Sequence, residues 1–156
     1  ANARADLLED ALCAVTPTER SDRAAVESVE KFWQSLGART ARLSPEAHDL
    51  VVARASHLPH VLATALVRCV LGGAENGEAD FCATGFRDST RLADGAAPMW
   101  RDIAMANPKA IVAALDDLQE ELDGLRTALE MEDAEALEQF FDEGRRLRSG
   151  WLKGRE

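Results

Sequence analysis

The segment that decides the fold is residues 44–71, which read SPEAHDLVVARASHLPHVLATALVRCVL. Ser44 and Pro45 suit the N-cap and first position of a helix, and the apolar pattern then continues as far as Gly72. Pro59 lies inside the pattern and removes one backbone donor, so we expect a kink about one turn before it. A helix that is apolar on nearly all sides belongs in the middle of a bundle.

The flanking sequence predicts four more helices from capping residues and apolar spacing, at about residues 22–36, 99–106, 108–129 and 133–151. From Ile111 to Leu129, apolar residues recur at alternating steps of four and three. This heptad-like seam suits an antiparallel or dimeric helix pair. We therefore expect an all-α fold, a bundle of about five helices with a long C-terminal helix pair that forms a dimer.

The N-terminal segment differs from the rest. Leu12–Val15 is a short apolar run ended by Thr16-Pro17-Thr18, as expected for one strand and a turn. One strand cannot form a sheet alone, so it either pairs with a domain outside this sequence or is not a strand. Residues 39–43 read as a short extended link, and residues 72–84 as a glycine- and acid-rich connection.

Composition excludes several classes of protein. The net charge of −10 argues against a nucleic-acid binder, which needs a basic face. Charged and imidazole side chains interrupt every long apolar run, and the first residues do not form a signal peptide, so we expect no membrane association. The three cysteines, Cys13, Cys69 and Cys82, lack zinc-type spacing and suit a reducing cytoplasm.

Ser56-His57-Leu58-Pro59-His60 is the most informative motif. Two histidines three residues apart project from one helical face, and they are costly on an apolar helix unless they find hydrogen-bond partners. Satisfied core histidines are one interpretation. Metal binding is another, although the pair supplies two ligands only and no carboxylate or cysteine stands at a matching offset.

Two later segments also hold candidate site residues. In Gly85–Arg91, the guanidinium of Arg91 could clamp a carboxylate and Asp88 could orient a cation, whereas a mixed-charge run is more usually a solvated turn. In Pro98–Ile103, Trp100 could form the wall of a pocket or anchor helix packing.

Taken in order, these motifs resemble the prephenate and arogenate dehydrogenase family. The resemblance extends from about residue 7 to residue 147 and rests on SHLPH (56–60), GFRD with TR (85–91), PMWRDI (98–103) and Asn107. Thr16-Pro17-Thr18 resembles the exit from the last strand of that family's nucleotide-binding domain. The resemblance implies that residues 1–20 are the tail of a Rossmann domain absent from this sequence, and that residues 21–156 form the helical substrate-binding and dimerisation domain.

The resemblance also implies the chemistry. Such enzymes oxidise prephenate, arogenate or both, with NAD or NADP accepting a hydride and carbon dioxide leaving. Arg91 matches an arginine that pairs with a substrate carboxylate, and His60 a catalytic-site histidine that faces the substrate. His57, Ser56, Trp100 and Asp88 match residues that shape or orient the substrate-binding pocket. Thr84 departs from the small glycine that the family often has there.

The same resemblance implies which functions this chain would carry and which belong to the other domain. No Gly-x-Gly-x-x-Gly fingerprint occurs in the sequence, and the family's principal catalytic histidine lies in the other domain. We therefore expect this fragment alone to bind no cofactor or metal and to be inactive, while the full-length enzyme acts as a homodimer in the cytoplasm. The alternatives are a non-catalytic helical dimerisation module and a metal-binding bundle that uses His57 and His60.

Overall fold

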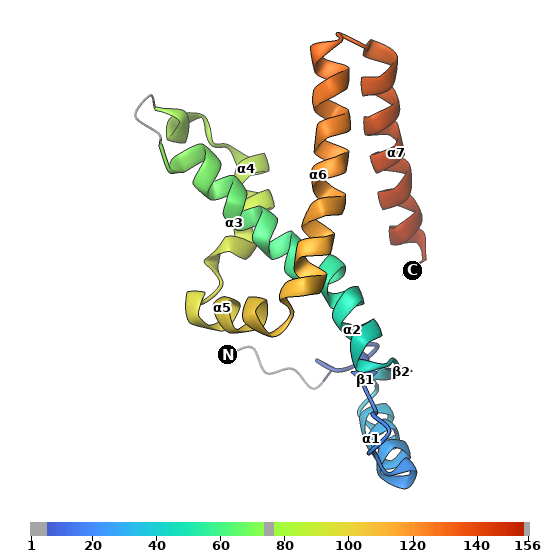
Figure 1. The fold of residues 1–156 in the computed structure, drawn as a ribbon. Coiled ribbons are helices and arrows are strands. Elements are labelled where there is room, and N and C mark those ends of the chain that lie inside the picture. The colour runs from blue at the N-terminus through green and yellow to red at the C-terminus, as the bar shows by residue number, and fades with distance from the viewer. Residues whose placement is uncertain (1–5, 74–76, 155–156) are drawn as a thin grey trace. The chain divides into compact units, whose positions relative to one another are not determined.

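The computed structural model describes residues 6–73 and 77–154 (Figure 1). Three short ranges lie outside the described residues: 1–5 in the predicted tail, 74–76 in the predicted connection, and 155–156 at the end of the predicted helical domain. Helices make up most of the described chain, and the strands form one two-stranded sheet, which confirms the predicted fold class. The chain divides into two compact units, Ala1–Ile111 and Val112–Glu156.

The first unit begins with a strand–helix–strand element: β1 (Leu12–Val15), α1 (Arg23–Ser35) and β2 (Arg39–Arg42). β1 and β2 pair in parallel, with Leu12 opposite Arg39. Parallel strands need a crossover connection, and α1 supplies it. The predicted strand is therefore present, and the alternative that it is not a strand is wrong. Its partner in this chain is the segment predicted as an extended link, and pairing with a further domain stays a prediction. Gly37, at φ +86°, allows the chain to turn between α1 and β2.

The central helix follows as α2 (Pro45–Val52), the π-helix η1 (Ala53–His57) and α3 (Leu58–Leu71). The Ser44 side chain caps α2 by accepting from the Ala47 N–H at 3.1 Å. The expected kink before Pro59 takes the form of the π-helix, which ends two residues before the proline.

By length and composition alone, Pro45–Leu71 could cross a membrane, since its most apolar window has a mean hydropathy of 1.4 and is only 17% buried. Arg54 and Arg68 interrupt it, however, and α3 packs against the short helical segments that follow it. We therefore interpret it as a bundle helix with apolar surface left uncovered in a single chain.

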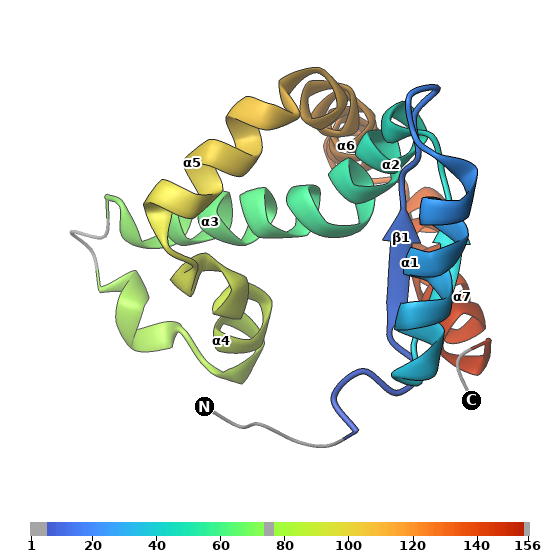
Figure 2. The ribbon, with the colours of Figure 1, turned by 90° about the horizontal axis from the view of Figure 1, so that it is seen from below.

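Those following segments are η2 (Glu78–Phe81), α4 (Thr84–Thr90), η3 (Arg91–Asp94) and α5 (Ala97–Ala106). Figure 2 shows α3 lying between α4 and α5. The helix predicted at residues 99–106 is α5, whereas no helix was predicted where α4 lies. α4 has no side-chain N-cap, so packing against α3 rather than a local capping signal stabilises it.

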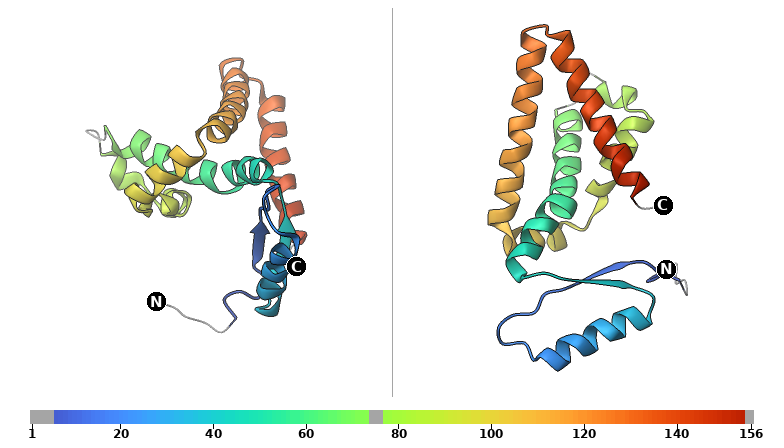
Figure 3. Two further views of the ribbon diagram at one scale, coloured as in Figure 1. Left: turned by 60° about the horizontal axis from the view of Figure 1, so that its bottom comes forward. Right: turned by 90° about the vertical axis from the view of Figure 1, so that its right-hand side faces the viewer.

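The second unit consists of most of α6 (Pro108–Glu130) together with α7 (Ala134–Lys153). The Asp133 carboxylate caps α7 by accepting from the Ala136 N–H at 3.0 Å. The two helices run antiparallel from a tight turn and diverge along their lengths (Figure 3). Both match their predicted positions to within about two residues, the usual uncertainty of helix ends.

Buried apolar side chains are small throughout the described residues. The core members are alanines and one isoleucine: Ala38, Ala53, Ala63, Ala110, Ile111, Ala114 and Ala128. No large side chain among the described residues is fully buried. Since hydrophobic stabilisation scales with the apolar area removed from water, this core is small for the number of large apolar residues in the chain.

Candidate functional site

Pro59 determines the local geometry of the histidine segment. Its nitrogen carries no hydrogen, and the helix widens into a π-turn just before it, where the Leu58 N–H donates to the carbonyl of Ala53 five residues earlier. Single π-turns inside α-helices occur frequently at functional sites. The widened turn ends at His57, and His60 follows about one turn later in α3.

Both imidazoles contact one indole, which α5 supplies. The His60 ring stacks on that of Trp100, with ring centroids 3.4 Å apart and planes 16° from parallel. The His57 ring meets the same indole edge-on at 6.2 Å. His60 is only 8% exposed, and the Thr64 hydroxyl donates to its carbonyl at 3.0 Å. The histidine motif and the tryptophan motif therefore form one aromatic cluster between α3 and α5.

His57 contributes an unsatisfied polar atom to this cluster. Its Nδ1 is buried and has no hydrogen-bond partner among the described residues. A buried polar atom without a partner costs about 1–3 kcal/mol, and most such atoms in folded proteins are paired. This nitrogen is therefore a natural point for a ligand group or water to complete the cluster.

The environment of His60 controls its charge. Burial lowers the pKa of His60 below its ordinary value of 6.5, because desolvation disfavours the imidazolium. The ring is therefore neutral at pH 7, with one nitrogen able to donate a hydrogen bond and the other able to accept one.

This lowered pKa predicts acid sensitivity. As the pH falls below 6.5, the unfolded chain takes up a proton at His60 before the folded chain does, so the free energy of unfolding decreases towards the folded-state pKa. We expect the replacement His60→Gln to flatten this slope in denaturation experiments between pH 7 and pH 5, at fixed protein concentration. His48→Gln removes a more exposed imidazole from α2 and is the control. Equal slopes in the original protein and His60→Gln would contradict the prediction.

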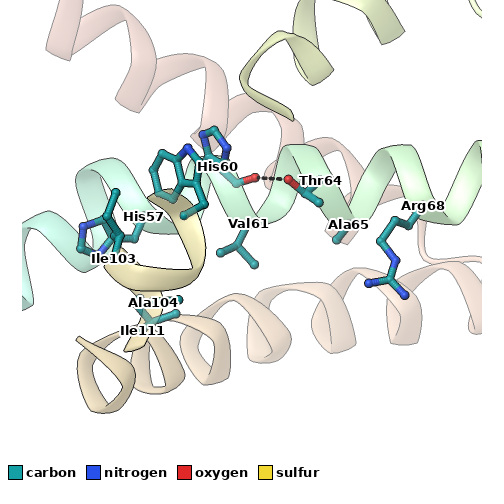
Figure 4. A pocket seen from close by; sticks show the side chains of 10 residues that line it. His57, His60, Val61, Thr64, Ala65, Arg68, Ile103, Ala104 and Ile111 are labelled. Carbon is teal, nitrogen blue, oxygen red and sulfur yellow. Dashed lines mark hydrogen bonds between the residues drawn. The ribbon is translucent and has the colours of Figure 1, made fainter. Parts of the chain in front are cut away.

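A pocket of about 450 Å³ opens beside the cluster (Figure 4). α3 and α5 form most of its wall. Its polar or aromatic lining residues are His57, His60, Thr64, Arg68 and Trp100, and its apolar ones are Val61, Ala65, Ile103, Ala104 and Ile111. Figure 4 shows Arg68 at the opposite end of the pocket from His57. The pocket thus combines an apolar middle with imidazoles at one end and a guanidinium at the other.

Three of the six predicted site residues meet here: His57, His60 and Trp100. Ser56 is exposed on η1 and does not line the pocket. Asp88 is exposed and lies 3.8 Å from Arg87 in an ion pair.

Arg91 is also outside the pocket lining. It is exposed at the start of η3, which packs against α3, and it forms no ion pair within the described residues. Its guanidinium is therefore free to meet an anion, but the convergence of Arg91 with His60 and Trp100 on one cleft stays a prediction.

Thr64 and Arg68 also line the pocket, and neither was predicted as a site residue from the sequence. His60, Thr64 and Arg68 follow one another at intervals of four residues, which places them on one face of α3. This spacing could have found them.

Metal-ligating side chains do not gather in the part of the chain that the structure describes. Within residues 6–73 and 77–154, there is no group of three or more histidine, cysteine or acidic residues placed to hold an ion. His57 and His60 both face the indole instead. The metal-binding alternative therefore lacks a third ligand among these residues.

The turn between β1 and α1 does not fit a dinucleotide. In nucleotide-binding strand–turn–helix units, glycines and a free helix N-terminus receive the pyrophosphate. Here the turn contains no glycine, and the Asp22 carboxylate already occupies the N-terminus of α1, accepting from the Ala25 N–H at 2.8 Å. A second anion at this position would be repelled.

Comparison with known families gives one clear match. The family described as "Prephenate dehydrogenase, dimerization domain" matches residues 44–143. The matched region starts at the N-cap of α2 and ends within α7. It includes all six predicted site residues and follows the β1–α1–β2 element.

Similar proteins agree with this match. The chain is 37% identical over 153 residues to the prephenate dehydrogenase of Bacillus subtilis, covering 96% of this chain and 41% of that protein. It is 33% identical over 147 residues to the cyclohexadienyl dehydrogenase of Zymomonas mobilis, and the match covers 92% of this chain and 50% of that protein. The crystal structure of A. aeolicus prephenate dehydrogenase with hydroxyphenyl propionate and NAD+ matches with a TM-score of 0.86 at 30% identity. The match covers 91% of this chain and 50% of that chain. The chain thus spans 41–50% of the length of these relatives.

Proposed function

The chain belongs to the prephenate dehydrogenase family, matching its dimerisation domain, and on this basis we propose that the full-length protein catalyses the oxidative decarboxylation of prephenate. The products are 4-hydroxyphenylpyruvate, carbon dioxide and a reduced nicotinamide nucleotide. The observation that carries the proposal is the family match over residues 44–143, which contains the His57–His60–Trp100 cluster. NAD or NADP would accept the hydride when bound to the full-length protein.

We assign the substrate contacts to two residues. Prephenate carries two carboxylates, so its site needs cations, and Arg91 offers an exposed guanidinium that no described residue pairs with. His60 is neutral and held by its stack on Trp100, which suits an imidazole that hydrogen-bonds the substrate. His60 serves as the catalytic-site histidine of this domain.

The remaining predicted residues support these two. Trp100 forms a wall of the pocket, and His57 lies edge-on to the same indole. Ser56 and Asp88 lie on the surface of this chain, where they would face the substrate only once the cleft with the neighbouring domain is formed. Asp88 would then orient a cation near the substrate.

Arogenate is the alternative substrate, either alone or together with prephenate. It carries an amino group where prephenate carries a keto group, so the choice depends on the polar groups around the side chain of the substrate. A cyclohexadienyl dehydrogenase stands among the similar proteins, which supports testing both substrates.

The same proposal includes a homodimer in the cytoplasm. Unpaired apolar faces on α6 and α7 support the dimer: Leu122 and Leu129 on α6 and Phe141 and Leu147 on α7 are each more than 40% exposed. Such faces are costly in water.

The test is turnover by the purified full-length protein. We expect reduced nicotinamide, followed by its absorbance, to form in equal amount to released carbon dioxide when prephenate is supplied. Parallel assays with arogenate, and with NAD against NADP, would assign substrate and cofactor. Absence of turnover with every combination, in a protein shown to be folded by circular dichroism, would overturn the proposal in favour of a non-catalytic dimerisation module.

A further inference from the structure

Gly95 lies against the edge of the His60–Trp100 stack. A Cβ atom built on Gly95 would stand 2.6 Å from His60 Cε1 and 2.7 Å from Trp100 Cδ1, and closer still to Trp100 Nε1. Real Cβ atoms essentially never approach other heavy atoms below 3.0 Å. Gly95 has an ordinary φ of −63°, so the backbone does not require a glycine here. The space does.

Neither ring can easily move away from such a Cβ. His60 is buried and its backbone belongs to the regular part of α3. Trp100 belongs to α5, and both atoms that the Cβ would meet are in the pyrrole half of its rigid indole. Gly95 itself is fixed by its N–H, which donates to the Leu92 carbonyl at 3.3 Å. An added methyl group must therefore displace a ring or the end of η3.

We infer that Gly95 is a positioning residue for the candidate site, because its missing side chain allows Trp100 to stack on His60 and fix the orientation of the imidazole. This inference rests on the proposed function only for its effect on turnover. The stack and its dependence on Gly95 are properties of the folded chain and can be measured without substrate.

The spectroscopic test uses full-length protein in which every tryptophan except Trp100, including Trp33 and Trp151, is replaced by phenylalanine, so that emission comes from Trp100. Indole emission depends on the groups in contact with the ring, so Gly95→Ala, which would displace the stacked imidazole, is expected to change the emission of Trp100. The matched control is Gly73→Ala, since a Cβ there meets nothing within 4 Å. Unchanged emission in Gly95→Ala, with circular dichroism like that of the control, would overturn the inference.

The kinetic test asks whether the effect passes through the stack. Gly95→Ala is expected to lower kcat/KM by about 10- to 100-fold, since a displacement of about 1 Å at a catalytic group can cost a hundredfold. In a Trp100→Ala background the same change should cost little more, because the vacated space lets His60 move aside. Fully additive losses would contradict a role through Trp100. If Trp100→Ala does not fold, the comparison of emission between Gly95→Ala and Gly73→Ala still tests whether Gly95 positions the two rings. A protein that turns over no substrate would refute the proposed function and leave the emission result intact.

Discussion

Replacing Arg91 with glutamine is expected to lower kcat/KM for prephenate by about a hundred- to a thousand-fold, or roughly 3–4 kcal/mol. Arg91 is exposed in this chain and forms no ion pair within the described residues. No ion pair with a described residue therefore has to be broken before the Arg91 guanidinium binds a carboxylate. In the proposed site the substrate carboxylate would lose water on binding, and without the guanidinium it would be left unpaired.

Arg91→Lys separates charge from geometry in this prediction. Lysine keeps the positive charge but lacks the planar fork that binds both oxygens of a carboxylate, so an intermediate loss is expected. Arg23→Gln is the control, because Arg23 is a highly exposed arginine of α1 that pairs with Glu27. Steady-state kinetics on all three variants would provide the measurement. An Arg91→Gln enzyme with the kcat/KM of the Arg23→Gln control would remove Arg91 from the site.

The helices could be predicted because their local signals agree with their packing. Ser44 and Asp133 cap α2 and α7 through their side chains, as their positions in the sequence indicate. Pro59 correctly indicated a disturbance one turn earlier, which the structure shows as a π-helix. At these positions a single residue type determines the backbone locally.

β2 and α4 could not be predicted in the same way. Arg39–Arg42 has two arginines and an alternation too short to mark a strand, and it becomes one only because β1 lies beside it. α4 is seven residues long, contains a glycine and has no side-chain cap. Both elements depend on non-local packing, which leaves little trace in a short segment of sequence.

The candidate site shows the same contrast. His57, His60 and Trp100 were found by motif and resemblance, and the structure places them together. The importance of Gly95 could not be predicted, because it arises from the approach of two rings that belong to different helices. The role of Arg91 stays a prediction, because Arg91 does not line the pocket that holds these three residues.

The long helix pair poses a physical problem for a single chain. On α7, Phe141 is 65% exposed and Leu147 is 64% exposed, and on α6 Leu129 is 58% exposed. The buried apolar residues of the described chain are alanines and one isoleucine. Because the large side chains stay mostly exposed, they add little to the stability of the unit that carries them. Burying each of them would contribute roughly 1.5–3 kcal/mol. A second copy of the chain is the simplest cover, since a two-fold interface uses the same face from both copies.

The double replacement of Phe141 and Leu147 by aspartate is therefore expected to convert the proposed dimer to monomer. A symmetric dimer would lose four buried side chains, or at least about 6 kcal/mol, which weakens association by more than about 10⁴-fold. Light scattering at micromolar concentration would measure the mass, and thermal denaturation should show a lower Tm, because dissociation removes the stabilisation that association provides. The matched control adds aspartate at Gln139 and Ser149, which lie two residues from each target and so on the opposite face of the same helix. This control adds the same charge without removing apolar surface, so it should remain dimeric. A double variant that is dimeric at the same concentration would show that the α7 face is covered by something other than a second copy, and a monomeric control would show that charge alone, not the apolar face, governs assembly.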